Sequence, residues 1–320
     1  MLKKIGILTS GGDAPGMNAT VIGAIKAGIA LNKDMYVVYD GYKGLIEKNF
    51  KKVDKHFIED KLASGGTAIK TARLPEFKEE EVRKIAVKNM KEEGIEALIV
   101  IGGDGSYMGA KRLTEMGINC VGLPGTIDND IASSDYTIGF DTALNTVVNA
   151  IDQIRDTMTS HNRCAIVEIM GNKCPDLTSF AGIATNADEV FTCDHPLDDK
   201  NALFDRMEEA KRNGKDCYII LVVEKLLDTK ELEKELNAKT SWETRLTILG
   251  HIQRGGKPTA MERINAVKMG AYAVELLDKG IGGVCIGIHE NKLRYVDIYD
   301  ALKLPRDEHR DLYQLHELIK

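Results

Sequence analysis

The chain has 320 residues, of which 43% are hydrophobic and 29% are charged. These proportions are those of a folded globular protein and exclude a disordered or collagen-like chain. The net charge is −6 and no run of Lys or Arg is longer than a pair, so we expect no nucleic-acid partner. A chain of this length predicts two lobes or one large α/β unit, and we carry the two lobes forward.

The beginning of the chain indicates where the protein works. The apolar run KIGILTS (4–10) ends at Gly11 and Gly12, well short of a membrane span, and no signal-peptide cleavage site follows. We therefore expect a cytoplasmic location and no membrane partner. The six cysteines are scattered without a C-x-x-C pair, which predicts reduced thiols and neither a zinc site nor a redox motif.

Apolar runs of strand length recur along the chain. They cover residues 4–10, 35–40, 96–103, 118–125, 164–171, 217–224 and 283–290. Because their hydrophobicity is continuous rather than alternating, these strands are expected to be buried on both faces, as in parallel sheets covered by helices. The sequence therefore predicts an α/β fold with two lobes.

Amphipathic segments separate the strands. In residues 79–94, Val82, Ile85, Ala86 and Met90 recur at helical spacing before a closing Gly94. Residues 141–158 predict a long helix, with Asp141 as its N-cap. The break between the lobes is expected near residues 136–141, where a series of strands and loops gives way to this helix.

Three predicted strands end in glycine-rich loops, SGGDAPG, IGGDGS and PGTIDND. The carboxyl ends of parallel strands share one edge of a sheet, and glycine lets backbone N–H groups approach phosphate oxygens there. Asp104 is a candidate magnesium ligand. Asp128 and Asp130 lie two residues apart, so mutual repulsion would raise the proton affinity of one, which suits a general base. For Asp130 a role as a cap of a turn is equally compatible with the sequence.

Five motifs in order resemble the phosphofructokinase family, in particular its bacterial ATP-dependent 6-phosphofructokinases. They are SGGDAPGMN, GGDGSYMGA, PGTIDND, TSHNR and GHIQRGG, and the resemblance covers essentially the whole chain. It implies transfer of the γ-phosphoryl group of ATP to the 1-hydroxyl of fructose 6-phosphate with Mg2+, in a cytoplasmic homotetramer. It also implies an ATP/Mg-binding lobe of residues 1–139 plus about 252–305, and a sugar-phosphate-binding lobe of residues 140–251 plus about 306–320.

The resemblance assigns roles on the nucleotide side. It implies that Asp128 accepts the proton of the sugar hydroxyl, that Thr126 and Asp130 support it, and that Arg73 meets the transferring phosphoryl group. Asp104 corresponds to the magnesium carboxylate. The positions that resemble the family's ATP-binding residues are Gly12, Tyr42, Arg73, Leu74, Gly103, Asp104, Gly105, Ser106 and Gly109.

The sugar-phosphate side is implied in the same way. Its positions are Thr126, Ile127, Asp128, Arg163, Met170, Gly171, Asn172, Glu224, Arg245, His251, Ile252, Gln253 and Arg254. In the family, Arg163 and Arg245 reach the site from a neighbouring subunit. Pyrophosphate-using relatives carry Asp and Lys where this chain has Gly105 and Gly125, so the resemblance favours ATP over pyrophosphate.

The chain departs from the family pattern at Asn172, where an arginine is usual. Loss of one charge-assisted hydrogen bond costs about 1.5–3 kcal/mol, or about one to two decades in rate, unless Lys173 compensates. The effector site for ADP or phosphoenolpyruvate corresponds to Lys26, Asp60, Arg155, Asp188 and Lys215. Because Ile22 and Asn213 replace cations there, weak or altered allosteric control is expected. A pyrophosphate-dependent enzyme and a catalytically weak regulatory paralogue that binds sugar phosphate are the alternatives.

Overall fold

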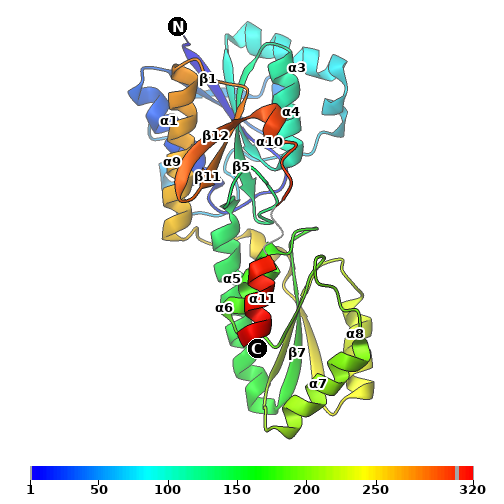
Figure 1. Cartoon of the computed structure of the whole chain (residues 1–320). Helices are drawn as coiled ribbons and strands as arrows, with labels where there is room; N and C mark the ends of the chain where they lie inside the picture. The colour runs from blue at the N-terminus through cyan, green and yellow to red at the C-terminus, as the bar shows by residue number, and fades with distance from the viewer. Residues whose placement is uncertain (1, 307–309, 320) are drawn as a thin grey trace. The chain divides into compact units, whose positions relative to one another are not determined.

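The computed structural model describes residues 2–306 and 310–319, and the chain divides into two compact units (Figure 1). Unit 1 comprises Met1–Thr142 and Arg254–Arg306, and unit 2 comprises Ala143–Gln253 and Asp307–Lys320. Positions 307–309 and 320 of the predicted sugar-phosphate lobe lie outside the described residues. Which ligand each unit binds stays a prediction.

Unit 1 is built on an eight-stranded sheet in the order β12-β11-β5-β4-β1-β2-β3, with the short β6 paired to β5. The strands are β1 (Lys4–Thr9), β2 (Asp34–Val38), β3 (Phe50–Val53), β4 (Ala97–Gly102), β5 (Asn119–Thr126), β6 (Ile138–Gly139), β11 (Val284–His289) and β12 (Lys292–Asp297). Only the edge strands β3 and β12 pair antiparallel. The central strands β1 and β4 are almost wholly buried, as their continuous hydrophobicity predicts.

Helices cover both faces of this sheet (Figure 1). They are α1 (Met17–Ala30), α2 (Tyr42–Glu47), α3 (Glu80–Glu93), α4 (Asp104–Glu115), α9 (Ala260–Asp278) and α10 (Ile298–Ala301), with short 3-10 turns at Glu59–Lys61 and Pro75–Lys78. Helices α1 and α9 pack closely because both contribute glycine at the contact. A Cβ on Gly270 would lie 2.2 Å from the carbonyl oxygen of Thr20, and one on Gly23 would lie 2.5 Å from that of Val267.

Unit 2 contains a four-stranded, wholly parallel sheet in the order β10-β7-β9-β8. Its strands are β7 (Arg163–Ile169), β8 (Glu189–Phe191), β9 (Tyr218–Val223) and β10 (Glu243–Ile248). Its helices are α5 (Phe140–His161), α6 (Asp176–Ala184), α7 (Lys200–Arg212), α8 (Thr229–Lys239) and α11 (Arg310–Ile319), and α5 begins in unit 1. Trp242 is 1% exposed in the core, and its indole N–H donates to the carbonyl oxygen of Met207 at 2.9 Å. The predicted α/β class with mainly parallel sheets is confirmed.

The predicted helices are present, with one correction. Helix α3 ends at Gly94, which has φ +78° as a left-handed C-cap requires. Asp141 is not the N-cap of α5 but its second residue, and its carboxylate accepts a hydrogen bond from the hydroxyl of Thr259 instead. The cap was wrongly predicted because a tertiary partner competes for this side chain.

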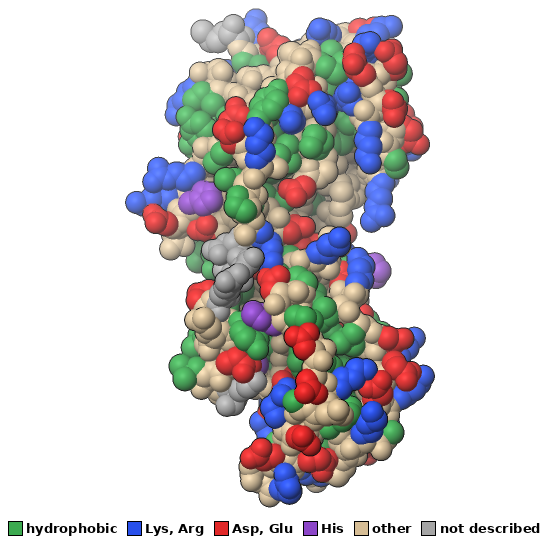
Figure 2. Space-filling view, turned by 45° about the vertical axis from the view of Figure 1, so that its right-hand side comes forward, with side chains coloured by type: hydrophobic (Ala, Val, Ile, Leu, Met, Phe, Trp, Pro, Cys, Tyr) green, Lys and Arg blue, Asp and Glu red, His purple; other side chains and the backbone are tan. Residues whose placement is uncertain are grey.

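The surface and the cysteines agree with a folded protein of mixed charge. Lys/Arg and Asp/Glu side chains are interspersed over the face shown in Figure 2. No disulfide joins any of the six cysteines, and only Cys193 is exposed. In the described part of the chain, no helix combines the length and the apolar character needed to cross a membrane.

Candidate active site

The glycine-rich loops lie on one edge of the unit 1 sheet. Strands β5, β4 and β1 are consecutive and parallel, so the loops that follow their carboxyl ends are neighbours. Between the first two of these loops, the Ser10 N–H donates to the carbonyl oxygen of Ile101 at 2.9 Å. This arrangement is the ligand-binding edge of an open α/β sheet.

The first loop is held in an open shape by its neighbours. A Cβ on Gly12 would lie 2.5 Å from Arg254 Nη1, so glycine allows the guanidinium to approach the backbone. Arg254 Nη1 donates to the carbonyl oxygen of Asp13 at 3.3 Å, and Thr71 Oγ1 donates to that of Gly11 at 3.0 Å. The structure therefore brings two predicted site residues, Gly12 and Arg254, together.

The second loop leads into α4 and leaves room for a ligand. A Cβ built on Gly103 or Gly105 would meet no protein atom within 4 Å. Gly109 lies instead under the ring of Tyr42, whose hydroxyl donates to the carbonyl oxygen of Ser106 at 2.5 Å. Tyr42 is only 5% exposed, so its hydroxyl supports the loop from the interior of unit 1.

The carboxylates of the second and third loops influence one another. Desolvation raises the pKa of Asp104, and the negative charge of Asp130 raises it further. Asp128 is buried, and its backbone N–H donates to Thr126 Oγ1 at 3.1 Å. Asn129 has φ +54°, and its side-chain oxygen accepts from the Thr137 N–H at 2.9 Å, which fixes the turn between the two acids.

The donor set fits a magnesium ion bound together with a phosphorylated ligand. Mg2+ usually takes one or two carboxylates and completes its shell with water and phosphate oxygens. Asp104, with Asp130 close enough to raise its pKa, supplies such oxygens and an excess of negative charge. Within residues 2–306 and 310–319, no cluster of three or more His, Cys, Asp or Glu forms a metal cage of protein ligands alone.

The segment between α2 and α3 supplies the remaining predicted nucleotide residues. Arg73 is exposed, which leaves its guanidinium accessible to a ligand. Leu74 is the residue before the turn Pro75–Lys78 and packs against the core cluster of unit 1.

In the third loop, Ile127 is fully buried, so its side chain supports the loop from the protein interior.

Unit 2 has a corresponding edge at the carboxyl ends of β7 and β9. The backbone N–H of Asn172 donates to Glu224 Oε1 at 3.1 Å, and Asn172 has φ +55°, a conformation that Asn tolerates better than most residues. Gly171 is buried beside it. The cation in contact with Asn172 is Lys225, whose Nζ lies 3.4 Å from its Oδ1, and not Lys173.

The turn Gly250–Arg254 follows β10 at the same edge. His251 and Ile252 are exposed. Gln253 is fully buried; its Oε1 accepts from the Met170 N–H at 3.1 Å and its Nε2 donates to the carbonyl oxygen of Gly250 at 3.0 Å. The Gln253 side chain therefore holds the edge together and is not accessible to a substrate.

Two predicted substrate arginines lie elsewhere. Arg163 is the first residue of β7, and its Nε donates to Glu243 Oε2 at 2.8 Å; Arg245 pairs with the same carboxylate. Because the β7 strand rises about 3.3 Å per residue, Arg163 lies on the order of 20 Å from the end that carries Met170. Within unit 2, these arginines and Glu224 are not brought together.

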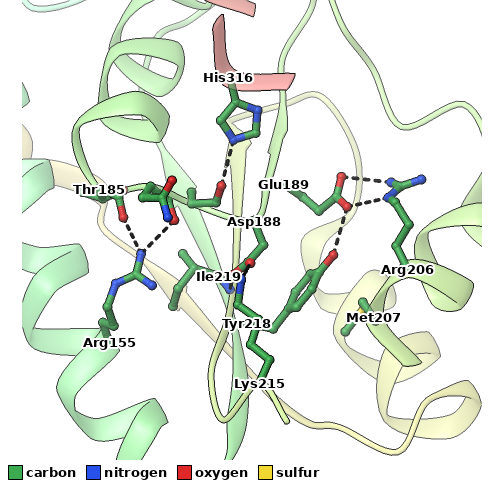
Figure 3. A network of polar contacts seen from close by, with 12 residues as sticks. Arg155, Thr185, Asp188, Glu189, Arg206, Met207, Lys215, Tyr218, Ile219 and His316 are labelled. Atoms are coloured by element: carbon green, nitrogen blue, oxygen red, sulfur yellow. Dashed lines mark hydrogen bonds and ion pairs between the residues drawn. The ribbon is translucent and has the colours of Figure 1, made fainter. Parts of the chain in front are cut away.

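The predicted effector residues are already paired. In unit 2, Lys215 pairs with Asp188, and Arg155 Nη2 donates to the carbonyl oxygen of Thr185 at 2.5 Å (Figure 3). In unit 1, Lys26 pairs with Glu59, and this bond, followed by one from His56, lowers the pKa of Glu59 to about 2. Asp60 pairs with Lys61 at 2.8 Å.

Comparison with known proteins identifies the architecture. Residues 4–277 match the model of the family described as phosphofructokinase. The chain belongs to the phosphofructokinase family. A relative from Vibrio campbellii, named ATP-dependent 6-phosphofructokinase, is 53% identical over 99% of both chains. One of the same name from Photobacterium profundum is 52% identical over the full length of both.

Solved phosphofructokinases share the fold. The chain superposes on phosphofructokinase from Saccharomyces cerevisiae with a TM-score of 0.91 and 33% identity, covering 98% of this chain and 50% of that one. A pyrophosphate-dependent phosphofructokinase from Marinobacter aquaeolei gives a TM-score of 0.82 at 16% identity, covering 99% and 92%. At 16% identity, the likeness to the pyrophosphate-dependent enzyme concerns the fold alone.

Two residues of this chain that the sequence motifs do not single out are Lys225 and Glu262. Lys225 has no motif of its own and becomes notable only beside Asn172. Glu262 lies three residues after Thr259, in the T-x-x-E pattern of a capping box, and that pattern could have drawn attention to it.

The coupling of the two carboxylates gives a testable prediction. Asp130→Asn removes the charge that raises the pKa of Asp104, so this pKa falls while desolvation keeps it above its ordinary value. NMR titration of 13C-labelled aspartate carboxyls measures the change. The exposed Asp152→Asn is the control and leaves the Asp104 titration unaltered. An Asp104 pKa that does not move in Asp130→Asn contradicts the arrangement.

Proposed function

We propose that this protein is an ATP-dependent 6-phosphofructokinase, which transfers the γ-phosphoryl group of ATP to the 1-hydroxyl of fructose 6-phosphate. The observation that carries the proposal is the common edge of β1, β4 and β5, where Gly103 and Gly105 leave open space beside Asp104. The names of the full-length relatives support the same activity. The protein would act in glycolysis, and its location in the cytoplasm stays a prediction.

The nucleotide is assigned to the glycine loops of unit 1. Backbone N–H groups around Gly12, Gly103 and Gly105 would face the phosphates, and the N-terminus of α4 favours negative charge there. A magnesium ion held by Asp104 would neutralise charge on the phosphate oxygens. Arg73, which is exposed and cationic, would stabilise the transferring phosphoryl group.

The base is assigned to Asp128. Its carboxylate would take the proton of the sugar 1-hydroxyl as that oxygen attacks the γ-phosphorus. Thr126 fixes the backbone of Asp128 through a 3.1 Å hydrogen bond. Asp130 would keep the local potential negative, which favours both the cation at Asp104 and a proton acceptor nearby.

In unit 2 the sugar phosphate is assigned to Glu224, His251 and the Met170–Asn172 segment; a role of Arg254, which belongs to unit 1, stays a prediction. Arg163 and Arg245 cannot join Glu224 within one unit 2, because they lie towards the amino ends of parallel strands whose carboxyl ends carry Glu224 and its neighbours. We therefore propose that they bind the 6-phosphate in the site of a neighbouring subunit, and that the active form is a homotetramer.

The preference for ATP over pyrophosphate as the phosphoryl donor is argued from Gly105. An Asp at this position would project into the open space assigned to the nucleotide, so glycine favours ATP. Gly125 is a weaker argument than the sequence suggested. A Cβ there would lie 2.9 Å from Met17 Cε and 3.0 Å from Ile101 Cγ2, so the packing of this chain already requires glycine.

ADP release by the purified protein with magnesium and fructose 6-phosphate tests the activity. We expect turnover with ATP and none with pyrophosphate. Asp128→Asn, which has nearly the same shape but a weak base, should reduce kcat about 10²- to 10⁴-fold. Asp152→Asn is the matched control. Binding of sugar phosphate without turnover on either donor would favour the regulatory paralogue, and turnover with pyrophosphate the other alternative.

The departure at Asn172 has a candidate compensation in Lys225. A Lys at this position can extend its ammonium towards a substrate phosphoryl group that the family's arginine would otherwise meet. Lys225 contacts both Asn172 Oδ1, at 3.4 Å, and Glu224 Oε1, at 3.9 Å, so it is directed to the substrate edge. We propose that Lys225 supplies the cation missing at Asn172.

Steady-state kinetics tests this compensation. Lys225→Met should lower kcat/KM for fructose 6-phosphate about 10- to 100-fold, the worth of one charge-assisted hydrogen bond. Asn172→Arg in the same chain should restore most of the loss. The exposed Lys234→Met on α8 is the control. Equal losses with and without Asn172→Arg, or none in Lys225→Met, contradict the role.

Effector control is expected to be weak. Lys26, Arg155 and Lys215 are engaged by Glu59, the Thr185 carbonyl oxygen and Asp188, so an anionic effector has to displace these partners. Ile22 and Asn213 add no charge where the family has cations.

Saturation curves for fructose 6-phosphate measure that control. ADP or phosphoenolpyruvate at millimolar concentration should change the half-saturating concentration less than about twofold. Asp188→Asn, which frees Lys215 from its partner, should increase the response. A strong shift in the unmodified protein that Lys215→Ala abolishes would contradict weak control.

A further inference from the structure

A carboxylic acid lies buried at the beginning of α9. Glu262 is 3% exposed, and its backbone N–H donates to Thr259 Oγ1, the helix N-cap, at 3.1 Å. In an ordinary capping box the Glu side chain would turn back to the N-cap N–H. Here Thr142 comes between them. The Thr259 N–H donates to Thr142 Oγ1 at 3.3 Å, and Thr142 Oγ1 donates to Glu262 Oε2 at 3.2 Å.

Glu262 therefore lies where three helices begin. The backbone N–H of Thr142, in the first turn of α5, also donates to Glu262 Oε2 at 3.3 Å. A Cβ on Gly16, the N-cap of α1, would lie 3.0 Å from Glu262 Cγ and 3.3 Å from its Oε1. Gly16 has φ +108°, so both space and conformation require glycine here.

The same side chain is one contact away from the segment of the proposed base. Gly139, whose backbone amide hydrogen-bonds Glu262, pairs with Thr126 between β6 and β5. A Cβ on Gly139 would lie 2.6 Å from Ala14 Cβ in the first loop and 3.3 Å from Ile127 Cγ2 in the third. Residues of the first and third loops thus meet at Gly139.

We propose that Glu262 is a positioning residue, which holds the first glycine loop and the Thr126–Asp128 segment in register without touching substrate. The inference rests on the functions proposed above for these two loops. Its mechanical basis is that the carboxylate accepts hydrogen bonds from α5 and Gly139 while its stem packs on Gly16. Loss of these bonds should shift the loops relative to one another.

Opposing effects set the pKa of the Glu262 carboxyl. Burial raises its pKa to about 7, the amides of Gly139 and Thr142 oppose this rise, and Asp141 of α5 adds to it. Asp141, Lys268 of α9 and Tyr136 line, with Glu262, a cavity of about 430 Å3. The first turn of α1 carries no acidic residue. The carboxyl therefore changes charge near neutral pH, where the enzyme would work.

The sign of the effect on stability follows from linkage. A carboxyl whose pKa is raised on folding binds its proton more tightly in the folded state. Stability is therefore highest below the ordinary pKa of Glu and falls as pH rises towards about 7. The ionised form, in contrast, is the better acceptor for the Thr142 and Gly139 amides. Activity and stability should then respond to pH in opposite directions.

The experiment compares Glu262→Gln with the exposed Glu275→Gln on the same helix. For the unmodified enzyme we expect kcat/KM for MgATP to rise through an inflection near pH 7. Glu262→Gln, which no longer titrates, should lose that inflection and raise KM for MgATP about 3- to 10-fold, with a smaller change in kcat. Glu275→Gln should match the unmodified enzyme.

Thr142 provides a second and independent variant. Thr142→Val removes the hydroxyl that links Thr259 to Glu262 and should raise KM for MgATP in the same way. Thr142→Ser retains the hydroxyl and should leave KM for MgATP close to that of the unmodified protein. Thermal unfolding of each variant from pH 5 to 8 identifies folding defects separately, since Glu262→Gln should lose the fall in stability towards pH 7.

The outcomes separate the two hypotheses. If the unmodified protein shows no ATP-dependent turnover, the proposed function fails whatever Glu262 does. If turnover is present but Glu262→Gln retains the inflection and the KM, the positioning role fails even where unfolding changes. Equilibrium binding of MgATP, followed by calorimetry, gives the same comparison without turnover and should weaken in Glu262→Gln and Thr142→Val.

Discussion

The parallel pairing of β1, β4 and β5 is the constraint on which the candidate site depends. Because these strands are neighbours with the same polarity, three segments far apart in sequence end at one edge. Glycine at positions 103 and 105 leaves that edge open, while Gly102, Gly109 and Gly125 are required by packing behind it. The glycines of these loops therefore divide into those that make room for a ligand and those that let the chain pack.

Strand polarity has the opposite consequence in unit 2. The same parallel order that collects Met170, Asn172 and Glu224 at the carboxyl edge keeps Arg163 and Arg245 towards the other end. A phosphate site that needs all of them can only be completed by another copy of the chain. Oligomerisation would then be part of the chemistry, because it supplies cations that one chain cannot bring to its own substrate.

Ion pairing is the physical basis of the weak effector control proposed for this chain. Buried acids such as Asp188 and Glu189 hold the nearby cations Lys215 and Arg206 (Figure 3). In unit 1, Lys26 is held by Glu59. A cation with an intramolecular partner is a poorer receptor for a phosphate, because the partner must be displaced and left in a low dielectric. At the edge proposed for the sugar phosphate the pairing is looser, since Lys225 lies 3.9 Å from the Glu224 carboxylate and remains exposed.

The sequence by itself determined the α/β class, the glycine loops, the family and the strands β1, β2, β4, β5, β7, β9 and β11, but not β3, β6, β8, β10 and β12. Continuous hydrophobic runs of strand length favour strands buried on both faces, and motifs such as PGTIDND are local in the chain. It also singled out Asp104, Asp128 and Asn172. Tertiary structure alone decided that Gln253 is buried, that Asp141 is not a helix cap and that Lys225 contacts Asn172. It also brought Glu262 to the start of three helices. These depend on contacts between residues far apart in the chain, such as Thr142 and Glu262, which are 120 positions apart, and no local pattern records them.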